Sequence, residues 1–137
     1  MTSLIRPWLV GGASAVLMAA AFACGGSSSG TPPSPTLTCS TLPNATTILI
    51  INNAVCPQSL TVARGTRVTV INNDTRRHDF ESDPHPEHTD CPELNQVGVL
   101  ESGQQRDSGN LNTVRRCGYH DHINDTIAAL KGSITIQ

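Results

Sequence analysis

Short runs of β-branched residues, separated by turn residues, most limit what this chain can fold into. Three such runs cover residues 47–51, 59–63 and 66–71, with an Arg-Gly turn between the second and the third. Strands of this length and spacing, with only residues 125–130 showing a helical turn, are typical of all-β domains. The pattern predicts an antiparallel β-sandwich or barrel. Further strands are expected at residues 96–100, 110–120 and 133–137.

The N-terminal segment reads as an export signal. Arg6 precedes an apolar run at residues 8–22, and Ala21-Phe22-Ala23 offers a small-x-small cleavage site before Cys24. A cysteine at this place, opening a Gly/Ser stretch, resembles a bacterial lipoprotein signal. We therefore expect an exported protein that is anchored by lipid on Cys24 in the bacterial cell envelope, in the periplasm or at the cell surface. Secretion after cleavage at Ala23 is the alternative.

The expected domain organisation follows from that signal. Residues 1–23 form the signal peptide, residues 24–37 a lipidated cysteine with a Gly/Ser/Pro tether, and residues 38–137 one small domain. The chain beyond residue 23 has eleven Asp and Glu, eight Lys and Arg, and only Phe80 and Tyr119 as aromatic residues. No basic patch with aromatic stacking groups is present, so a nucleic-acid partner is not expected.

All five histidines lie between residues 78 and 122, in two groups. His78, His85 and His88 fall in the stretch HDFESDPHPEH, and His120 and His122 fall in HDH. Two histidines separated by one residue on an extended strand leave the same face, about 7 Å apart. Together with a third histidine they would form a three-nitrogen site of the kind that binds Cu(II) or Zn(II).

The order of these features resembles the cupredoxin family of copper proteins, which includes plastocyanin. The likeness lies in the stretch VARGTRVTV at residues 62–70, an Asn-Asn-Asp turn followed by His78, the strand end Gly118-Tyr119-His120, and the final GSITI at residues 132–136. It covers about residues 45–137. The resemblance implies a cupredoxin-like Greek-key β-sandwich or barrel, with His78 at the position of the family's first histidine ligand.

Two alignments compete for the position of the family's copper-binding thiolate. If Cys117 is the thiolate, His120 follows at the family's C-x-x-H spacing. If Tyr119 is the aromatic residue two before the ligand, Asp121 takes the thiolate position, and the eleven residues from there to Gly132 suit a plastocyanin-like ligand loop. The family's axial Met is missing in both, because the chain beyond residue 23 has no Met.

The number of cysteines favours a structural role for Cys117. With Cys24 as the lipid anchor, four cysteines remain, and an even set in an oxidising compartment most simply forms two disulfides. Of the three pairings that four cysteines allow, we expect Cys39–Cys56 and Cys91–Cys117.

The expected metal ligands are then imidazoles. His78, His120 and His122 form the first set, with Asp121 as a weaker candidate, while His85 and His88 could complete the same site, form a second one or remain solvated. Copper is the expected metal, as Cu(II), with Zn(II) as the alternative.

The function expected from these features is that of a copper-binding, cupredoxin-like lipoprotein in electron transfer or copper handling. Its expected partners are the membrane, through the lipid anchor, and a redox or copper-delivery protein. A copper superoxide dismutase-like enzyme and a metal-free structural module are the alternatives.

Overall fold

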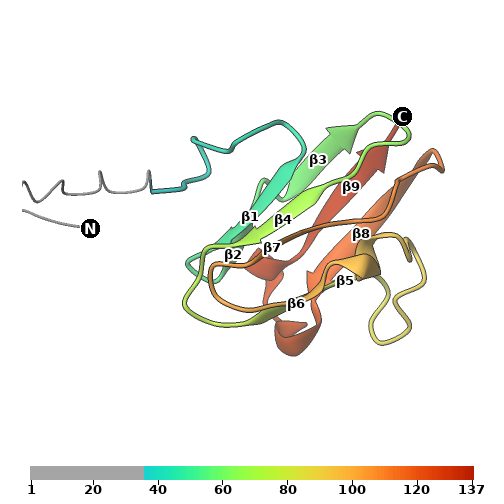
Figure 1. Ribbon diagram of the computed structural model, residues 1–137. Coiled ribbons are helices and arrows are strands. Elements are labelled where there is room, and N and C mark those ends of the chain that lie inside the picture. The colour runs from blue at the N-terminus through green and yellow to red at the C-terminus, as the bar shows by residue number, and fades with distance from the viewer. Residues whose placement is uncertain (1–35) are drawn as a thin grey trace, which may run out of the picture. The chain divides into compact units, whose positions relative to one another are not determined.

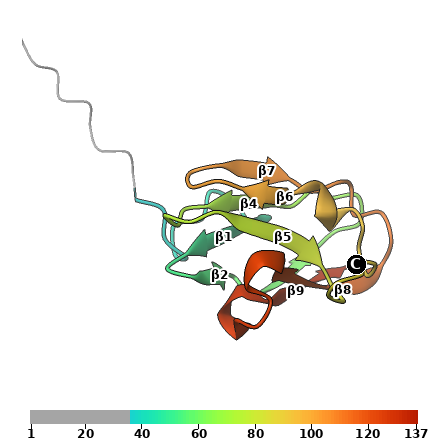
Figure 2. The same ribbon diagram turned by 90° about the horizontal axis from the view of Figure 1, so that it is seen from below.

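The computed structural model describes residues 36–137, which form two β-sheets packed face to face (Figures 1 and 2). The first sheet has the strand order β2-β1-β4-β7 and the second has the order β3-β9-β8-β5-β6. The strands are β1 (Thr47–Ile51), β2 (Ala54–Cys56), β3 (Ser59–Val62), β4 (Thr69–Asn72), β5 (His78–Ser82), β6 (Gly98–Leu100), β7 (Gln105–Asp107), β8 (Arg115–Asp121) and β9 (Gly132–Ile136). Three short 3-10 helices, η1 (Leu94–Gln96), η2 (His122–Asn124) and η3 (Ala128–Leu130), complete this part of the chain.

The predicted all-β sandwich is confirmed, but its sheets are mixed and not antiparallel as predicted. β1 pairs with β4 in parallel, and β3 pairs with β9 in parallel. The parallel pairs arise because the chain changes sheet between strands that neighbour each other in sequence: β3, which precedes β4, belongs to the other sheet. The other strand pairs are antiparallel.

The strand predictions hold best where β-branched residues are densest. β1 spans the predicted residues 47–51, and β9 starts one residue before the predicted 133–137. Residues 110–114 are not a strand, and β8 begins only at Arg115. The strands β2, β5 and β7 were not predicted from sequence, since their residues lack a clear β-branched pattern.

The core between the sheets is aliphatic apart from one aromatic pair and the buried Cys91–Cys117 disulfide. The rings of Phe80 on β5 and Tyr119 on β8 lie 4.6 Å apart between centroids, and both side chains are buried. The Tyr119 hydroxyl donates a hydrogen bond to the carbonyl of Pro57. Other buried side chains of the core are Ile48, Ile50, Val68, Val70, Leu94, Leu111, Ile134 and Ile136.

Both predicted disulfides are present. Cys39 is bonded to Cys56 and Cys91 to Cys117, each with a Cα–Cα distance of 5.7 Å. Cys117 is therefore structural, as the number of cysteines indicated, and is not a free thiolate. Cys24 and the expected signal peptide lie outside the described residues. No helix within residues 36–137 is long and apolar enough to cross a membrane.

Candidate metal centre

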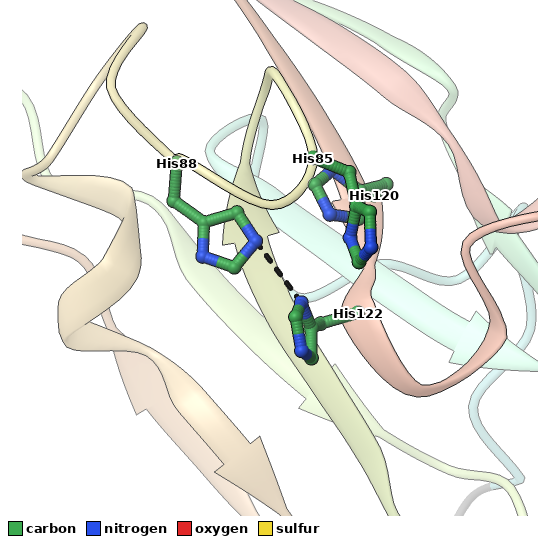
Figure 3. Close-up of side chains that lie close together, drawn as sticks. All are labelled: His85, His88, His120 and His122. Carbon is green, nitrogen blue, oxygen red and sulfur yellow. Dashed lines mark hydrogen bonds between the residues drawn. The ribbon is translucent and has the colours of Figure 1, made fainter.

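Four of the five histidines converge on one side of the five-stranded sheet (Figure 3). His120 is near the end of β8 and His122 is the first residue of η2. His85 and His88 come from the loop of residues 83–91, which follows β5 and passes beside β8. The end of β8 with the start of η2, and the loop after β5, thus each contribute two imidazoles to a single cluster, which we call the histidine cluster.

The ring nitrogens of the histidine cluster are close enough to share one ion. One nitrogen from each of the four rings lies within 4.8 Å of the corresponding atom of every other ring. The Nδ1 of His122 and the Nε2 of His88 are already 3.0 Å apart. An ion bound about 2 Å from each nitrogen requires separations of about 3–4 Å between nitrogens, so small side-chain rotations suffice.

His120 is the buried member of the histidine cluster, and its two ring nitrogens have different surroundings. Its Nδ1 lies 2.7 Å from the Oδ1 of Asp83. Its Nε2 is buried and has no hydrogen-bond partner. A buried polar atom without a partner is costly, and an ion at the centre of the cluster would give this nitrogen its partner. The donor set and its one unsatisfied nitrogen therefore fit a bound metal.

His88 is held in place through its backbone. It adopts a left-handed conformation with φ of 53°, which few residues other than glycine take up. Its amide donates to the carbonyl of Pro84 and its carbonyl accepts from the side-chain amide of Asn95 in η1. The same Asn95 side chain accepts from the amide of Ser82 at the end of β5. These contacts tie the loop to the sheet and fix where the His88 ring stands.

The surroundings of His88 favour its neutral imidazole form. Burial lowers the pKa of His88, and the neighbouring rings of His122, His120 and His85 lower it further. Neutral imidazole is the form that binds a metal. Nearby, burial raises the pKa of Glu81 to about 7, helped by the charge of Asp79.

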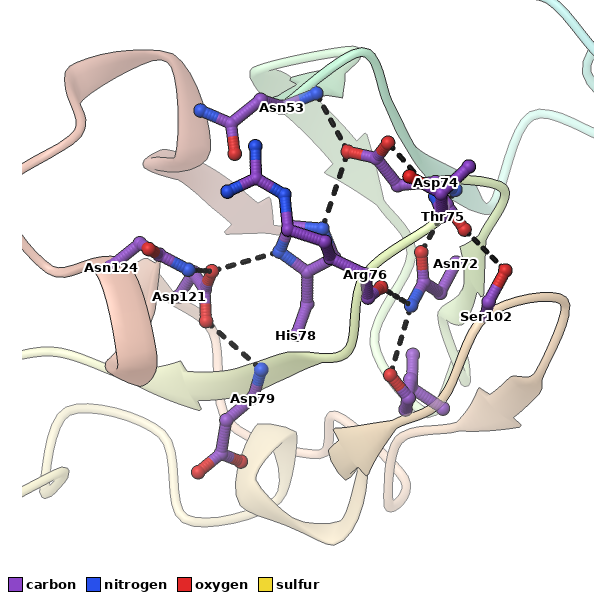
Figure 4. Close-up of polar contacts among 11 residues, drawn as sticks. Asn53, Asn72, Asp74, Thr75, Arg76, His78, Asp79, Ser102, Asp121 and Asn124 are labelled. Carbon is purple, nitrogen blue, oxygen red and sulfur yellow. Dashed lines mark hydrogen bonds and ion pairs between the residues drawn. The ribbon is translucent and has the colours of Figure 1, made fainter.

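His78 lies in a different place, between two carboxylates (Figure 4). Its Nδ1 is 2.8 Å from the Oδ2 of Asp121, and its Nε2 is 3.4 Å from the Oδ2 of Asp74. Asp121 also accepts hydrogen bonds from the Asp79 amide and the Asn124 side chain. Both ring nitrogens of His78 are thus engaged, and no metal fits between them without breaking these contacts.

The expected grouping of His78 with His120 and His122 is therefore wrong. His78 shares a face of β5 with Phe80, whose side chain is in the core between the sheets. His120 is on β8, opposite Glu81 of β5, and points to the other face. His85 and His88 take the place that His78 was expected to fill. That any of these residues binds a metal stays a prediction.

Burial disfavours the charged form of Asp121 and Asp74, the two partners of His78, but the hydrogen bonds that they accept have the larger effect on their pKa values. For Asp121, burial raises the pKa, while bonds from the Asp79 amide, Asn124 and His78 bring it below its usual value. For Asp74, burial again raises the pKa, and bonds from Asn53, Thr75 and His78 lower it overall. Both are therefore carboxylates in a network that crosses one end of the sandwich.

Solved structures with a similar arrangement of strands include a plastocyanin and an amicyanin. A plastocyanin from Dryopteris crassirhizoma is 18% identical, with a TM-score of 0.53 over 66% of this chain and 99% of that chain. A reduced amicyanin variant is 14% identical, with a TM-score of 0.53 over 72% of this chain and 89% of that chain. This domain has the cupredoxin fold.

The likeness extends to one part of a larger enzyme. A copper-containing nitrite reductase from Thermus scotoductus is 21% identical, with a TM-score of 0.51 over 70% of this chain and 23% of that chain. No family model matches this chain. No curated protein matches it. The cupredoxin fold predicted from the sequence is thus confirmed by structure alone.

The contact between His78 and Asp121 bears on the two alignments that the sequence left open. The resemblance placed His78 at the first histidine ligand, and one of its two alignments placed Asp121 at the thiolate. The structure brings these two side chains into contact and puts Cys117 in a disulfide, so it supports that alignment. The sequence reasoning missed Asp83 and Asp74. Their position in the sequence could have indicated them, because each lies within five residues of a histidine in a stretch rich in His and Asp.

Proposed function

We propose that this protein binds one Cu(II) ion through His85, His88, His120 and His122 and serves in copper handling outside the cytoplasm. The observation that carries the proposal is the buried Nε2 of His120, which has no hydrogen-bond partner and belongs to a ring grouped with three other imidazoles. Imidazole nitrogen favours Cu(II) over the other common divalent ions on intrinsic affinity. Zn(II) is the competing metal for the same donors. The copper-binding neighbours of the same fold support the choice of copper.

Copper handling is better supported than electron transfer by the available ligands. Fast, high-potential copper sites use a cysteine thiolate. Here Cys117 is bonded to Cys91, and the chain beyond residue 23 has no Met. An all-nitrogen site whose His85 ligand is exposed suits an ion that enters and leaves. The partner in this proposal is a protein that delivers copper to this site or takes it away.

The proposed location rests on the sequence of the N-terminal segment and on the disulfides. A lipid anchor on Cys24 would hold the domain at a membrane surface of the bacterial cell envelope. The two disulfides of the domain fit an oxidising compartment. Metabolic labelling with a radioactive fatty acid tests the anchor: wild-type protein should carry label, and Cys24→Ala should not.

Titration of the metal-free protein with Cu(II), followed by optical and electron paramagnetic resonance spectra, tests the site. We expect one equivalent to bind, with nitrogen hyperfine splitting and without the intense absorption near roughly 600 nm that a copper–thiolate bond gives. His120→Ala should abolish stoichiometric binding. Zn(II) competition in the same titration determines which ion the site prefers.

The matched control is His78→Gln, because His78 is the one histidine outside the cluster. It should bind one equivalent of copper with an unchanged spectrum, although the protein becomes less stable. Loss of copper in His78→Gln together with full binding in His120→Ala would contradict the proposed site. An intense band near roughly 600 nm would contradict the all-nitrogen ligand set.

A further inference from the structure

Asp83 links the strand that carries His120 to the loop that carries His85 and His88. Its carboxylate lies 2.7 Å from the Nδ1 of His120, on β8. Its backbone amide donates to the carbonyl of Gly118, on the same strand. Its backbone carbonyl accepts from the amide of Asp90 and so closes the base of the loop that carries His85 and His88. One residue thereby connects the strand that carries His120 to the loop that carries His85 and His88.

We propose that Asp83 is the positioning residue of this site: its carboxylate holds the proton of His120 on Nδ1 and so turns an unprotonated Nε2 toward the metal. This inference rests on the proposed copper site and adds a residue that touches no metal. A carboxylate is an acceptor only, so the Nδ1 that faces it must donate. In a neutral imidazole the other nitrogen then has a free lone pair. That nitrogen is the buried Nε2 without a partner.

Asp83 is the hydrogen-bond partner of the His120 Nδ1 among the described residues. The His120 side chain is 1% exposed, so water does not compete freely for its ring, whereas the Asp83 side chain is 42% exposed and stays solvated at its outer edge. Carboxylates that accept from the second nitrogen of a metal-binding histidine orient the ring and make it a better ligand. Their removal commonly weakens metal binding about 10–100-fold.

Gly118 makes the room that Asp83 needs. A Cβ at Gly118 would overlap the carboxylate of Asp83, which crosses directly over the strand there. The nearest atoms that the added Cβ would meet are side-chain atoms of Asp83 and not backbone atoms. The carboxylate of Asp83 must therefore move, whereas the backbone of β8 can stay in place. Gly118→Ala should therefore displace Asp83 from His120 without removing the carboxylate from the protein.

The test compares Asp83→Ala, Asp83→Asn and Gly118→Ala in two measurements. The first is the tautomer of His120 in the metal-free protein, read from ring ¹⁵N shifts at a pH where the imidazoles are neutral. Wild type should carry the proton on Nδ1. Asp83→Ala and Gly118→Ala should shift the proton toward Nε2. Asp83→Asn should keep the wild-type tautomer, because the amide oxygen can still accept from Nδ1.

The second measurement is the dissociation constant for Cu(II), obtained by competition with a chelator. Asp83→Ala and Gly118→Ala should weaken binding about 10–100-fold at unchanged one-to-one stoichiometry, with Asp83→Asn between them and wild type. The role of Asp83 is overturned if Asp83→Ala keeps both the tautomer and the affinity, even if its melting temperature falls. If wild type binds no copper, the proposed function fails, while the ¹⁵N shifts still decide whether Asp83 sets the tautomer.

Discussion

His120 and Asp121 are consecutive residues of β8, and their side chains leave the strand on opposite faces of the sheet. Asp121 is opposite Phe80 on β5 and contacts His78 at one end of the core. His120 is opposite Glu81 and meets the loop histidines on the other face. The strand therefore separates a buried His–carboxylate network from a candidate metal centre, although the residues alternate within one short stretch.

The His78 network should make stability fall in acid. The folded-state pKa values of Asp74 and Asp121 lie below the ordinary value of 3.8. Their stabilisation is therefore fully present above that value and is lost as the pH falls through the lower folded-state pKa values. We expect the free energy of unfolding, measured with urea, to fall as the pH drops from about 4 to about 2.

Asp121→Asn should lower the free energy of unfolding at neutral pH by about 2 kcal/mol, because it removes charge-assisted hydrogen bonds. It should also flatten the acid dependence. Glu101→Gln, at an exposed position, is the matched control and should change neither quantity by more than about 0.5 kcal/mol. An acid dependence in Asp121→Asn as steep as in wild type would show that other groups cause it.

Part of this arrangement can be predicted from the sequence, and part cannot. Because side chains alternate along an extended strand, the sequence already predicts that Asp121 points away from His120 and His122. A contact between Asp121 and His78 therefore places His78 on the face that His120 and His122 do not share. What the sequence could not show is which residue of β5 faces which residue of β8, since that register is fixed by long-range pairing. The predicted Cys91–Cys117 disulfide partly indicated that the loop with His85 and His88 lies beside β8.

Copper binding should fail when the imidazoles are protonated. Four neutral rings are needed, and ordinary imidazole takes up a proton near pH 6–7. Because the pKa of His88 is lowered, His88 stays neutral further into acid than an ordinary exposed imidazole. A titration monitored by the copper spectrum should show release as the pH falls through about 6. Full retention at about pH 4.5 would contradict a histidine site.

Gly132→Ala should destabilise the domain without changing the metal centre. A Cβ there would overlap the hydroxyl of Tyr119 and the backbone carbonyl oxygen of Gln58. The carbonyl can move only if the backbone between β2 and β3 moves with it. Such overpacking costs about 1–3 kcal/mol. Thermal unfolding should show the loss, whereas the dissociation constant for copper should stay within about twofold of wild type. Tyr119→Phe in the same chain should recover part of the loss.

Removing the two disulfides should affect the affinity for Cu(II) differently, although it should lower the free energy of unfolding by similar amounts. They close stretches of similar separation, 17 residues for Cys39–Cys56 and 26 for Cys91–Cys117. Removing either pair by double substitution to Ala should lower the free energy of unfolding by about 3 kcal/mol. Only the second pair fixes the end of the loop with His85 and His88 to β8. Its loss should therefore weaken Cu(II) binding at least about 10-fold, as loosened ligand support does elsewhere, while loss of Cys39–Cys56 leaves the affinity unchanged. Chelator competition on both folded variants measures this difference, and equal affinities would show that the loop holds its histidines in place without the Cys91–Cys117 bond.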